Sequence, residues 1–119
     1  MPRKRERRSV CPVACTLDLI GDKWTLLVVR DLAHGKAHYG EFLASPEGIA
    51  TNILADRLQR LVENGLVERQ ASPVSPARDA YYLTRKGESL KPVLGAIKAW
   101  GLENVPGTAV RLKTPGRAA

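Results

Sequence analysis

The segment between Ile49 and Gly65 constrains the fold more than any other part of this chain. Its apolar residues Leu54, Leu58 and Leu61 recur at spacings of three and four, which places them on one face of a helix. Polar side chains occupy most of the remaining helix surface. Gly65 is typical of a helix stop, because glycine adopts the left-handed conformation at no steric cost. The pattern predicts an amphipathic helix that packs one face on a protein core and leaves the other face free.

Three helices are expected before this segment. The first is expected to begin at Cys11–Pro12, since proline is favoured at a first helical position, and to end at Gly21. Asp22 is a suitable N-cap for a second helix over residues 23–35, which is apolar on nearly every side and is therefore expected to be central and buried. A short third helix over His38–Ala44 leads through a turn into the amphipathic helix.

Two short strands are expected after the amphipathic helix, at Leu66–Gln70 and Ala80–Leu83. The connection between them contains two prolines and two serines, which favours a hairpin with a loop. Thr84 can cap a last helix with an apolar stripe that starts at Leu90. Pro92 lies inside that helix and predicts a kink or a new start near it. The expected fold is mainly α with a small β-hairpin: a winged helix-turn-helix with additional N- and C-terminal helices.

The net charge of +7 is distributed unevenly along the 119 residues. The basic excess lies in residues 1–10 and 105–119, which we expect to be flexible tails. Residues 11–104, the predicted folded domain, contain as many basic as acidic side chains. The basic tails either attract phosphate groups without regard to sequence or are simply solvated ends that aid solubility.

Several classes of protein do not fit the sequence. It contains no run of 18 or more apolar residues and no apolar signal-peptide stretch, so no membrane span is predicted and the cytoplasm is the expected location. No catalytic constellation and no glycine-rich phosphate loop are present, so neither enzyme activity nor a cofactor is expected. His34 and His38 lie four residues apart but no acidic or cysteine ligand cluster accompanies them, so no metal site is expected.

Several stretches together resemble the HxlR-type winged-helix transcriptional regulators of bacteria, which are related in fold to the MarR type. They are CPVACTLDLIGDKWTLLVVRDL, HYGEFL, GIATNILADRLQRLVENGLVER and YYLTRKGESLKPVL with AIKAWG, between about Cys11 and Gly101. The resemblance implies a homodimer, held mainly by the first and last helices, that binds a pseudo-palindromic operator in double-stranded DNA. Members of the HxlR-type family include repressors and activators. Ala50 stands where family members often have a serine, so Thr51 is an alternative cap of the recognition helix.

Candidate DNA contacts follow from the amphipathic helix, because the first residues of a recognition helix normally reach base edges. Thr51 and Asn52 occupy that position. An asparagine can pair with adenine, and a threonine methyl group can contact a thymine methyl group. Arg57 and Arg60 lie further along the helix, where they could touch phosphates or deeper bases. The alternative is that all four are ordinary polar residues of a surface helix.

Two candidates lie outside this helix. Arg78 lies in the loop of the predicted wing, where an arginine can reach a minor groove or a backbone phosphate. Its alternative partner is the neighbouring Asp79. Tyr39 could donate its hydroxyl to a phosphate, or it could simply cover the core.

Cys11 is a candidate redox-sensing residue. It is predicted at the N-cap of the first helix, and a helix N-terminus with Arg7 and Arg8 nearby favours the reactive thiolate. Its position also matches the cysteine at which some HxlR-type members sense oxidants or electrophiles. The alternative is a small apolar residue at a dimer interface. Cys15 lies one turn further, where a disulfide within the helix is geometrically poor and a bridge to the partner subunit is more credible.

The sequence leaves three functional hypotheses. The favoured one is a dimeric, sequence-specific transcriptional regulator, with any redox or small-molecule effector unassigned. A small thiol enzyme that uses Cys11 lacks a resolving-cysteine or thioredoxin-like context. A winged-helix module for protein interaction or chromosome architecture suits a neutral domain. That module predicts weakly salt-dependent DNA binding, whereas each phosphate contact contributes a log–log slope of about −0.9.

Overall fold

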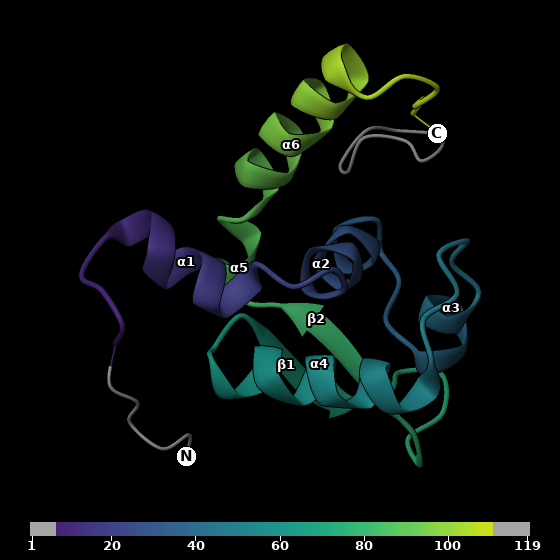
Figure 1. Ribbon diagram of the computed structural model, residues 1–119. Helices are drawn as coiled ribbons and strands as arrows, with labels where there is room; N and C mark the ends of the chain where they lie inside the picture. The colour runs from purple at the N-terminus through teal and green to yellow at the C-terminus, as the bar shows by residue number, and fades with distance from the viewer. Residues whose placement is uncertain (1–6, 111–119) are drawn as a thin grey trace.

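The computed structural model describes residues 7–110 of the chain. Within this range the elements are α1 (Pro12–Ile20), α2 (Thr25–Ala33), α3 (Tyr39–Leu43), α4 (Thr51–Glu63), β1 (Val67–Ala71), β2 (Asp79–Leu83), α5 (Arg85–Glu88) and α6 (Lys91–Asn104). Helix α2 contacts α4, β2 and α6, whereas α1 and the far end of α6 extend away from the body (Figure 1). This mainly helical fold with one antiparallel hairpin confirms the predicted winged helix-turn-helix.

Helix α4 forms as the sequence pattern predicts. Leu54, Leu58 and Leu61 are buried, and the polar residues between them other than Arg57 are exposed. Gly65 has a φ of +75°, the left-handed conformation that lets the chain leave the helix. The Leu66 N–H donates to the Leu61 carbonyl oxygen at 2.9 Å and closes the helix end, so β1 follows at once.

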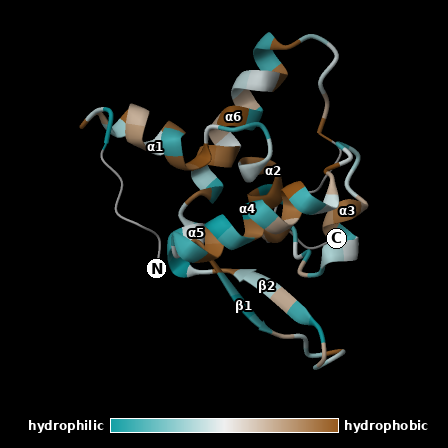
Figure 2. Cartoon of the chain, turned by 60° about the horizontal axis from the view of Figure 1, so that its bottom comes forward, coloured by the Kyte–Doolittle hydropathy of each residue, from teal (hydrophilic) through white to brown (hydrophobic). Residues whose placement is uncertain are grey.

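The strands pair from Val67 opposite Leu83 to Ala71 opposite Asp79. Residues 72–78 connect them, and we call this segment the wing loop. Figure 2 shows the hairpin reaching away from the helices. The predicted hairpin is confirmed, with each strand extended by one residue at the loop end and β1 starting one residue later.

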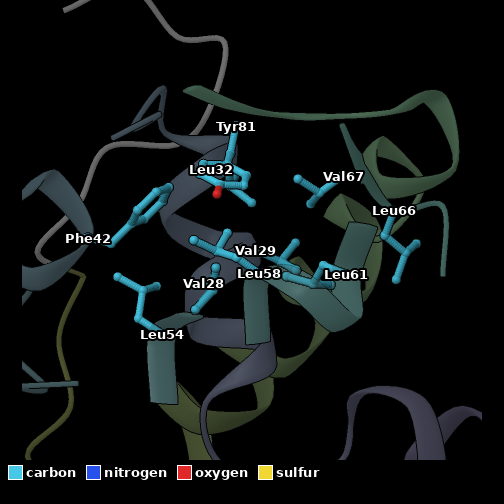
Figure 3. Close-up of a cluster of buried hydrophobic side chains, with 10 residues drawn as sticks. All are labelled: Val28, Val29, Leu32, Phe42, Leu54, Leu58, Leu61, Leu66, Val67 and Tyr81. Atoms are coloured by element: carbon cyan, nitrogen blue, oxygen red, sulfur yellow. The ribbon is translucent and has the colours of Figure 1, made fainter. Parts of the chain in front are cut away.

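One cluster of buried apolar side chains joins α2, α3, α4 and the hairpin (Figure 3). Its members are Val28, Val29, Leu32, Phe42, Leu54, Leu58, Leu61, Leu66, Val67 and Tyr81. Burying a side chain of this size stabilises a fold by about 1.5–3 kcal/mol. The prediction that α2 is central is confirmed for its Val28–Val29–Leu32 face, but Trp24, Leu26 and Leu27 are only half-buried.

The starts of α2 and α4 differ from the prediction or decide between its alternatives. The second helix begins at Thr25 rather than at residue 23, because Asp22 Oδ2 accepts from the N–H groups of Trp24 and Thr25 and caps a preceding turn. Ala50 is the N-cap of α4 and Thr51 is its first helical residue, so the alternative cap at Thr51 is wrong.

The last predicted helix divides in two. Thr84 caps α5 by accepting a hydrogen bond from the Gly87 N–H at 3.1 Å, as predicted. A new helix, α6, then starts at Lys91 and holds Pro92 in its first turn. Proline is tolerated there because its missing N–H has no partner within the helix anyway. The new start is therefore the alternative that the structure selects.

The predicted tails fall mainly outside the described residues, because residues 1–6 and 111–119 are not described. Within the described part, Arg8 Nε donates to Asp18 Oδ1 of α1 at 2.8 Å, and both side chains are exposed. The tail boundaries at residues 10 and 105 stay predictions. None of the described helices is long and apolar enough to span a membrane.

Candidate DNA-binding surface

Helices α3 and α4 form the helix-turn-helix. They contact each other, and Phe42 of α3 and Leu54 of α4 both belong to the core cluster. The turn between them uses Gly48 in the left-handed region, with a φ of +73°. Because both helices are held from inside by the core, the outer face of α4 keeps a fixed orientation relative to the body.

A buried polar network fixes the turn that precedes α4. The Ser45 hydroxyl donates to Asp31 Oδ2 at 2.5 Å and accepts from Lys36 Nζ at 2.7 Å. Arg30 bridges Asp31 and Glu47, with 2.8 Å between its Nη2 and Glu47 Oε1. The Glu47 hydrogen bond and the nearby Asp31 raise the pKa of Arg30 despite its burial. These contacts tie the C-terminal end of α2 to the turn, and the sequence pattern did not predict them.

The predicted base-reading residues lie where the prediction needs them. Thr51 and Asn52 are the first two residues of α4, and both are exposed. Arg60 lies about two turns further along the helix and is also exposed. Its Nη1 is 3.7 Å from Asp56 Oδ2. The structure thus brings an amide, a hydroxyl and a guanidinium to the free side of the helix, an arrangement suited to a groove lined by base edges and phosphates.

Arg57 is placed differently from these three residues. Its Nε donates to Asp22 Oδ2 at 2.8 Å and its Nη1 to Asp56 Oδ2 at 2.5 Å. Only 17% of its side chain is exposed. The Asp22 hydrogen bond is the main cause that raises the pKa of Arg57. The guanidinium is therefore engaged by two carboxylates, which compete with the predicted DNA contact.

Asp22 gives an acid-sensitive contribution to stability. Burial alone would raise the pKa of Asp22, but hydrogen bonds from Thr25, Arg57 and the N–H groups of Trp24 and Thr25 outweigh it and hold the pKa well below its usual value. A depressed folded-state pKa means that the ionised carboxylate stabilises the fold above the unfolded pKa of about 3.9 and loses this effect as the pH falls.

The Asp22→Asn variant isolates this effect, since the amide oxygen can still accept from the two N–H groups. We expect the difference in free energy of unfolding between wild type and variant to be largest above about pH 5 and to shrink toward pH 2. Urea unfolding at fixed protein concentration across this range measures it. A difference that stays constant with pH would mean that the Asp22 charge adds nothing to stability.

The wing loop presents Arg78 to solvent. Among the described residues Arg78 has no ion-pair partner, so Asp79 is not its partner in this structure. Tyr39 is half-buried, and its ring meets Tyr81 edge-on with 6.0 Å between the ring centroids. Burial, followed by the neighbouring Tyr81, raises the pKa of Tyr39. Tyr39 therefore covers the core cluster, while its predicted phosphate contact stays untested.

His38, considered above only as a metal ligand, fixes the root of the wing to the start of α3. Glu41 Oε1 accepts from the N–H groups of Ala37 and His38, and these bonds lower the pKa of Glu41. The same carboxylate lies 3.3 Å from His38 Nδ1, and His38 Nε2 forms a hydrogen bond with the Ser72 hydroxyl at 2.8 Å. No local pattern could reveal this contact, because His38 and Ser72 are 34 residues apart.

Comparison with known proteins decides the family. A profile described as HxlR-like helix-turn-helix matches residues 19–108. The chain belongs to the HxlR-like helix-turn-helix family. The residues matched include the whole of α2 to α6, and with them the helix-turn-helix and the wing.

Individual HxlR-like relatives agree in sequence and in structure. The HTH-type transcriptional regulator sll1512 of Synechocystis sp. is 35% identical over 96 residues, which are 81% of this chain and 71% of the relative. The crystal structure of PA1607 is similar with a TM-score of 0.80 and 42% identity, over 94% of this chain and 80% of that chain. The oxidised form of the redox regulator HypR is similar with a TM-score of 0.71 and 32% identity, over 84% of this chain and 100% of that chain. The chain is thus a transcriptional regulator with a helix-turn-helix DNA-binding fold, and the thiol-enzyme hypothesis is excluded.

The two cysteines of this HxlR-like regulator lie at the start of α1, with Cys11 at the N-cap as predicted. Cys11 is exposed, and Cys15 is half-buried with its Sγ donating to the Ser9 carbonyl oxygen at 3.3 Å. Arg8 forms an ion pair with Asp18, so the Asp18 carboxylate already neutralises the positive charge of Arg8, which was expected to act on the Cys11 thiol. Within residues 7–110 no group of three or more His, Cys, Asp or Glu residues could hold a metal ion.

A second surface of the regulator is apolar and lies away from α4. Helix α6 has no buried residue, and its large apolar side chains Ile97 and Trp100 are 51% and 64% exposed. Val13 and Leu17 of α1 are likewise exposed, and α1 makes only sparse contacts with the other described elements. Large apolar side chains gathered on two projecting helices are typical of an interaction surface rather than of a free monomer surface.

Proposed function

We propose that this HxlR-like regulator binds a pseudo-palindromic DNA operator as a homodimer. The observation that supports it most is the exposed N-terminal end of α4, held in a fixed orientation by the core and by the Asp31–Ser45 network. A helix presented in this way fits a major groove. A two-fold symmetric dimer offers two such helices, which matches two inverted half-sites about one helical turn apart.

The exposed apolar residues of α1 and α6 support the dimer part of the proposal. Pairing these helices with their copies in a partner would remove Val13, Leu17, Ile97 and Trp100 from water. It would also leave α4 and the wing free to face DNA, since both lie on other parts of the fold (Figure 1).

Each proposed DNA contact has a distinct task. Thr51 and Asn52 contact base edges from the first turn of α4, and Arg60 contacts a phosphate from about two turns further along the same helix. Arg78 reaches from the wing loop to a minor groove or a phosphate. Tyr39 is proposed only for its hydroxyl, because its ring already packs on Tyr81.

Genomic selection tests the proposal. Duplex fragments of the source genome are offered to the full-length chain at near-physiological salt with excess nonspecific competitor. We expect recovery of one or a few inverted-repeat sites, with a binding slope against salt that reports several phosphate contacts. A flat pool of sequences with a shallow slope would favour the protein-interaction or architectural module instead.

Asn52 provides a residue-level prediction. Asn52→Ala is expected to lose about 1–3 kcal/mol of discrimination between the selected site and a site altered at one base pair, while most of the salt-dependent affinity remains. Titration of both duplexes at two salt concentrations measures this loss. The matched control is Gln59→Ala, an exposed residue of the same helix whose side chain bonds Glu63. Equal weakening on every duplex would assign Asn52 to phosphate rather than to a base.

The proposal also includes redox control of operator binding through Cys11. HypR, a relative in structure, is a redox regulator, and Cys11 of this chain is an exposed thiol at a helix N-terminus. We expect treatment with the thiol oxidant diamide to change operator affinity in the wild type and not in Cys11→Ser. The Cys15→Ser variant is the control for the neighbouring thiol. An unchanged response in Cys11→Ser would remove Cys11 as the sensor.

A further inference from the structure

The link between Arg57 and Asp22 joins two parts of the fold with different tasks. Arg57 lies in the middle of α4, the proposed recognition helix, and Asp22 lies in the connection between α1 and α2. The two side chains are 35 residues apart in sequence, and 17% and 27% exposed. Both charges are therefore partly withdrawn from water and face each other.

Asp22 is a rigid anchor for this contact. Its Oδ2 accepts from the Trp24 and Thr25 N–H groups at 3.0 and 3.1 Å, and its Oδ1 accepts from the Thr25 hydroxyl. All these donors belong to the start of α2, so the carboxylate cannot move without the turn that it caps. Arg57 consequently connects α4 to a fixed point.

The end of α1 is tied to the same point. Gly21, directly before Asp22, donates its N–H to the Leu17 carbonyl oxygen at 2.7 Å. A Cβ atom at Gly21 would lie 2.4 Å from that oxygen, so the junction has no room for a larger residue. Because Gly21 and Asp22 are adjacent, this junction is one route by which a displacement of α1 reaches the start of α2, beside the packing of Leu19 against the core cluster.

We propose that Arg57 is a positioning residue that, through Asp22, couples α1 to the angle of the recognition helix. The inference rests on the proposed function, in which α1 lies at the subunit interface and α4 reads the operator. Arg57 then sets the separation of the two recognition helices in the dimer, and does not contact DNA. This replaces the sequence-based assignment of Arg57 as a DNA contact, because Asp22 and Asp56 occupy its guanidinium.

The test is selection from a library of two half-sites joined by spacers of different length. The half-sites are those that the wild type selects from genomic DNA. We expect the wild type to prefer one spacer. Arg57→Met and, independently, Asp22→Asn are expected to raise the relative binding of the neighbouring spacers about two- to fivefold for each subunit, the ratio typical of one partly exposed ion pair. Arg57→Lys, which keeps a charge opposite Asp22, is expected to restore part of the preference.

Salt dependence separates positioning from DNA contact. Arg57→Met should leave the slope of log affinity against log salt unchanged, whereas loss of a phosphate contact would lower its magnitude by about 0.9 per subunit. Arg60→Met is the matched control on the same helix, and it should lower the slope while keeping the spacer preference. A lowered slope for Arg57→Met, or an unchanged spacer preference in Asp22→Asn, would overturn the inference. A wild type that selects no inverted repeat would instead overturn the proposed function. Asp22→Asn retains the backbone cap, so it tests the inference even if Arg57→Met fails to fold.

Discussion

Gly87→Ala is expected to be among the most destabilising single substitutions in this chain, although it adds only one methyl group. A Cβ atom at Gly87 would lie 2.0 Å from the Leu66 carbonyl oxygen and 3.0 Å from Leu83 Cδ2. The nearest atom belongs to the backbone, so no rotation of a side chain can relieve the clash. Helix α5 would have to move away from the start of β1.

That movement would break more than one contact. The Thr84 N–H donates to the Leu66 carbonyl oxygen at 3.0 Å, and the Thr84 hydroxyl donates to the Gly65 carbonyl oxygen at 2.6 Å. Lys86 Nζ adds a third bond, to the Asn64 carbonyl oxygen at 3.0 Å. These bonds join α5 to the end of α4, so the clash at Gly87 acts on the recognition helix as well.

We expect Gly87→Ala to lower the free energy of unfolding by about 3 kcal/mol, the upper end of the usual cost of overpacking. Urea unfolding followed by circular dichroism at fixed protein concentration measures it. The matched control is Gly40→Ala in α3, where a Cβ atom would meet nothing within 4 Å. Alanine is the better helix former, so this control should be neutral or stabilising by up to about 1 kcal/mol. Equal stability of the two variants would mean that α5 does not approach Leu66 this closely.

The sequence was sufficient to predict the elements whose cause is local. The spacing of Leu54, Leu58 and Leu61 gave the buried face of α4, and Gly65 gave its end, because both depend only on helix geometry and on the left-handed conformation. Pro92 predicted a break in the last helix. The sequence did not distinguish a kink from a new start, because that choice depends on the Thr84 cap and on the docking of α5 against Leu66.

The contacts that position the candidate DNA-binding surface join residues far apart in the sequence, so no local sequence pattern could predict them. Asp22 was predicted as the N-cap of the second helix and instead caps the turn before α2, and nothing in its neighbourhood shows that Arg57 approaches it from α4. Arg57 and Arg60 are the same residue type on one helix, yet only the tertiary fold places one against a carboxylate anchor and leaves the other exposed. His38 was weighed as a metal ligand, and its actual partner Ser72 lies in the wing loop.

Ile97→Glu is the substitution expected to affect operator binding most, and it does so without touching DNA. Ile97 is 51% exposed, and no residue of α6 is buried, so a glutamate there should leave the fold of the single chain intact. In the proposed dimer the same position is desolvated against the partner. A charge buried without a partner costs several kcal/mol, which corresponds to at least a 100-fold weaker dimer for about 3 kcal/mol.

Operator affinity should fall with the dimer, because a monomer contacts one half-site and loses the benefit of the linked second half-site. Sedimentation equilibrium gives the subunit dissociation constant, and titration of the selected duplex gives the affinity, for which we expect a loss of at least about 100-fold. Val74→Glu is the matched control for the sedimentation measurement: it makes the same kind of change at a residue of the wing loop that is 77% exposed, and it should leave the dimer intact. An Ile97→Glu protein that remains dimeric would place the interface away from this part of α6. A wild type that is monomeric both free and on DNA would remove the dimer, and with it the inverted repeat, from the proposal.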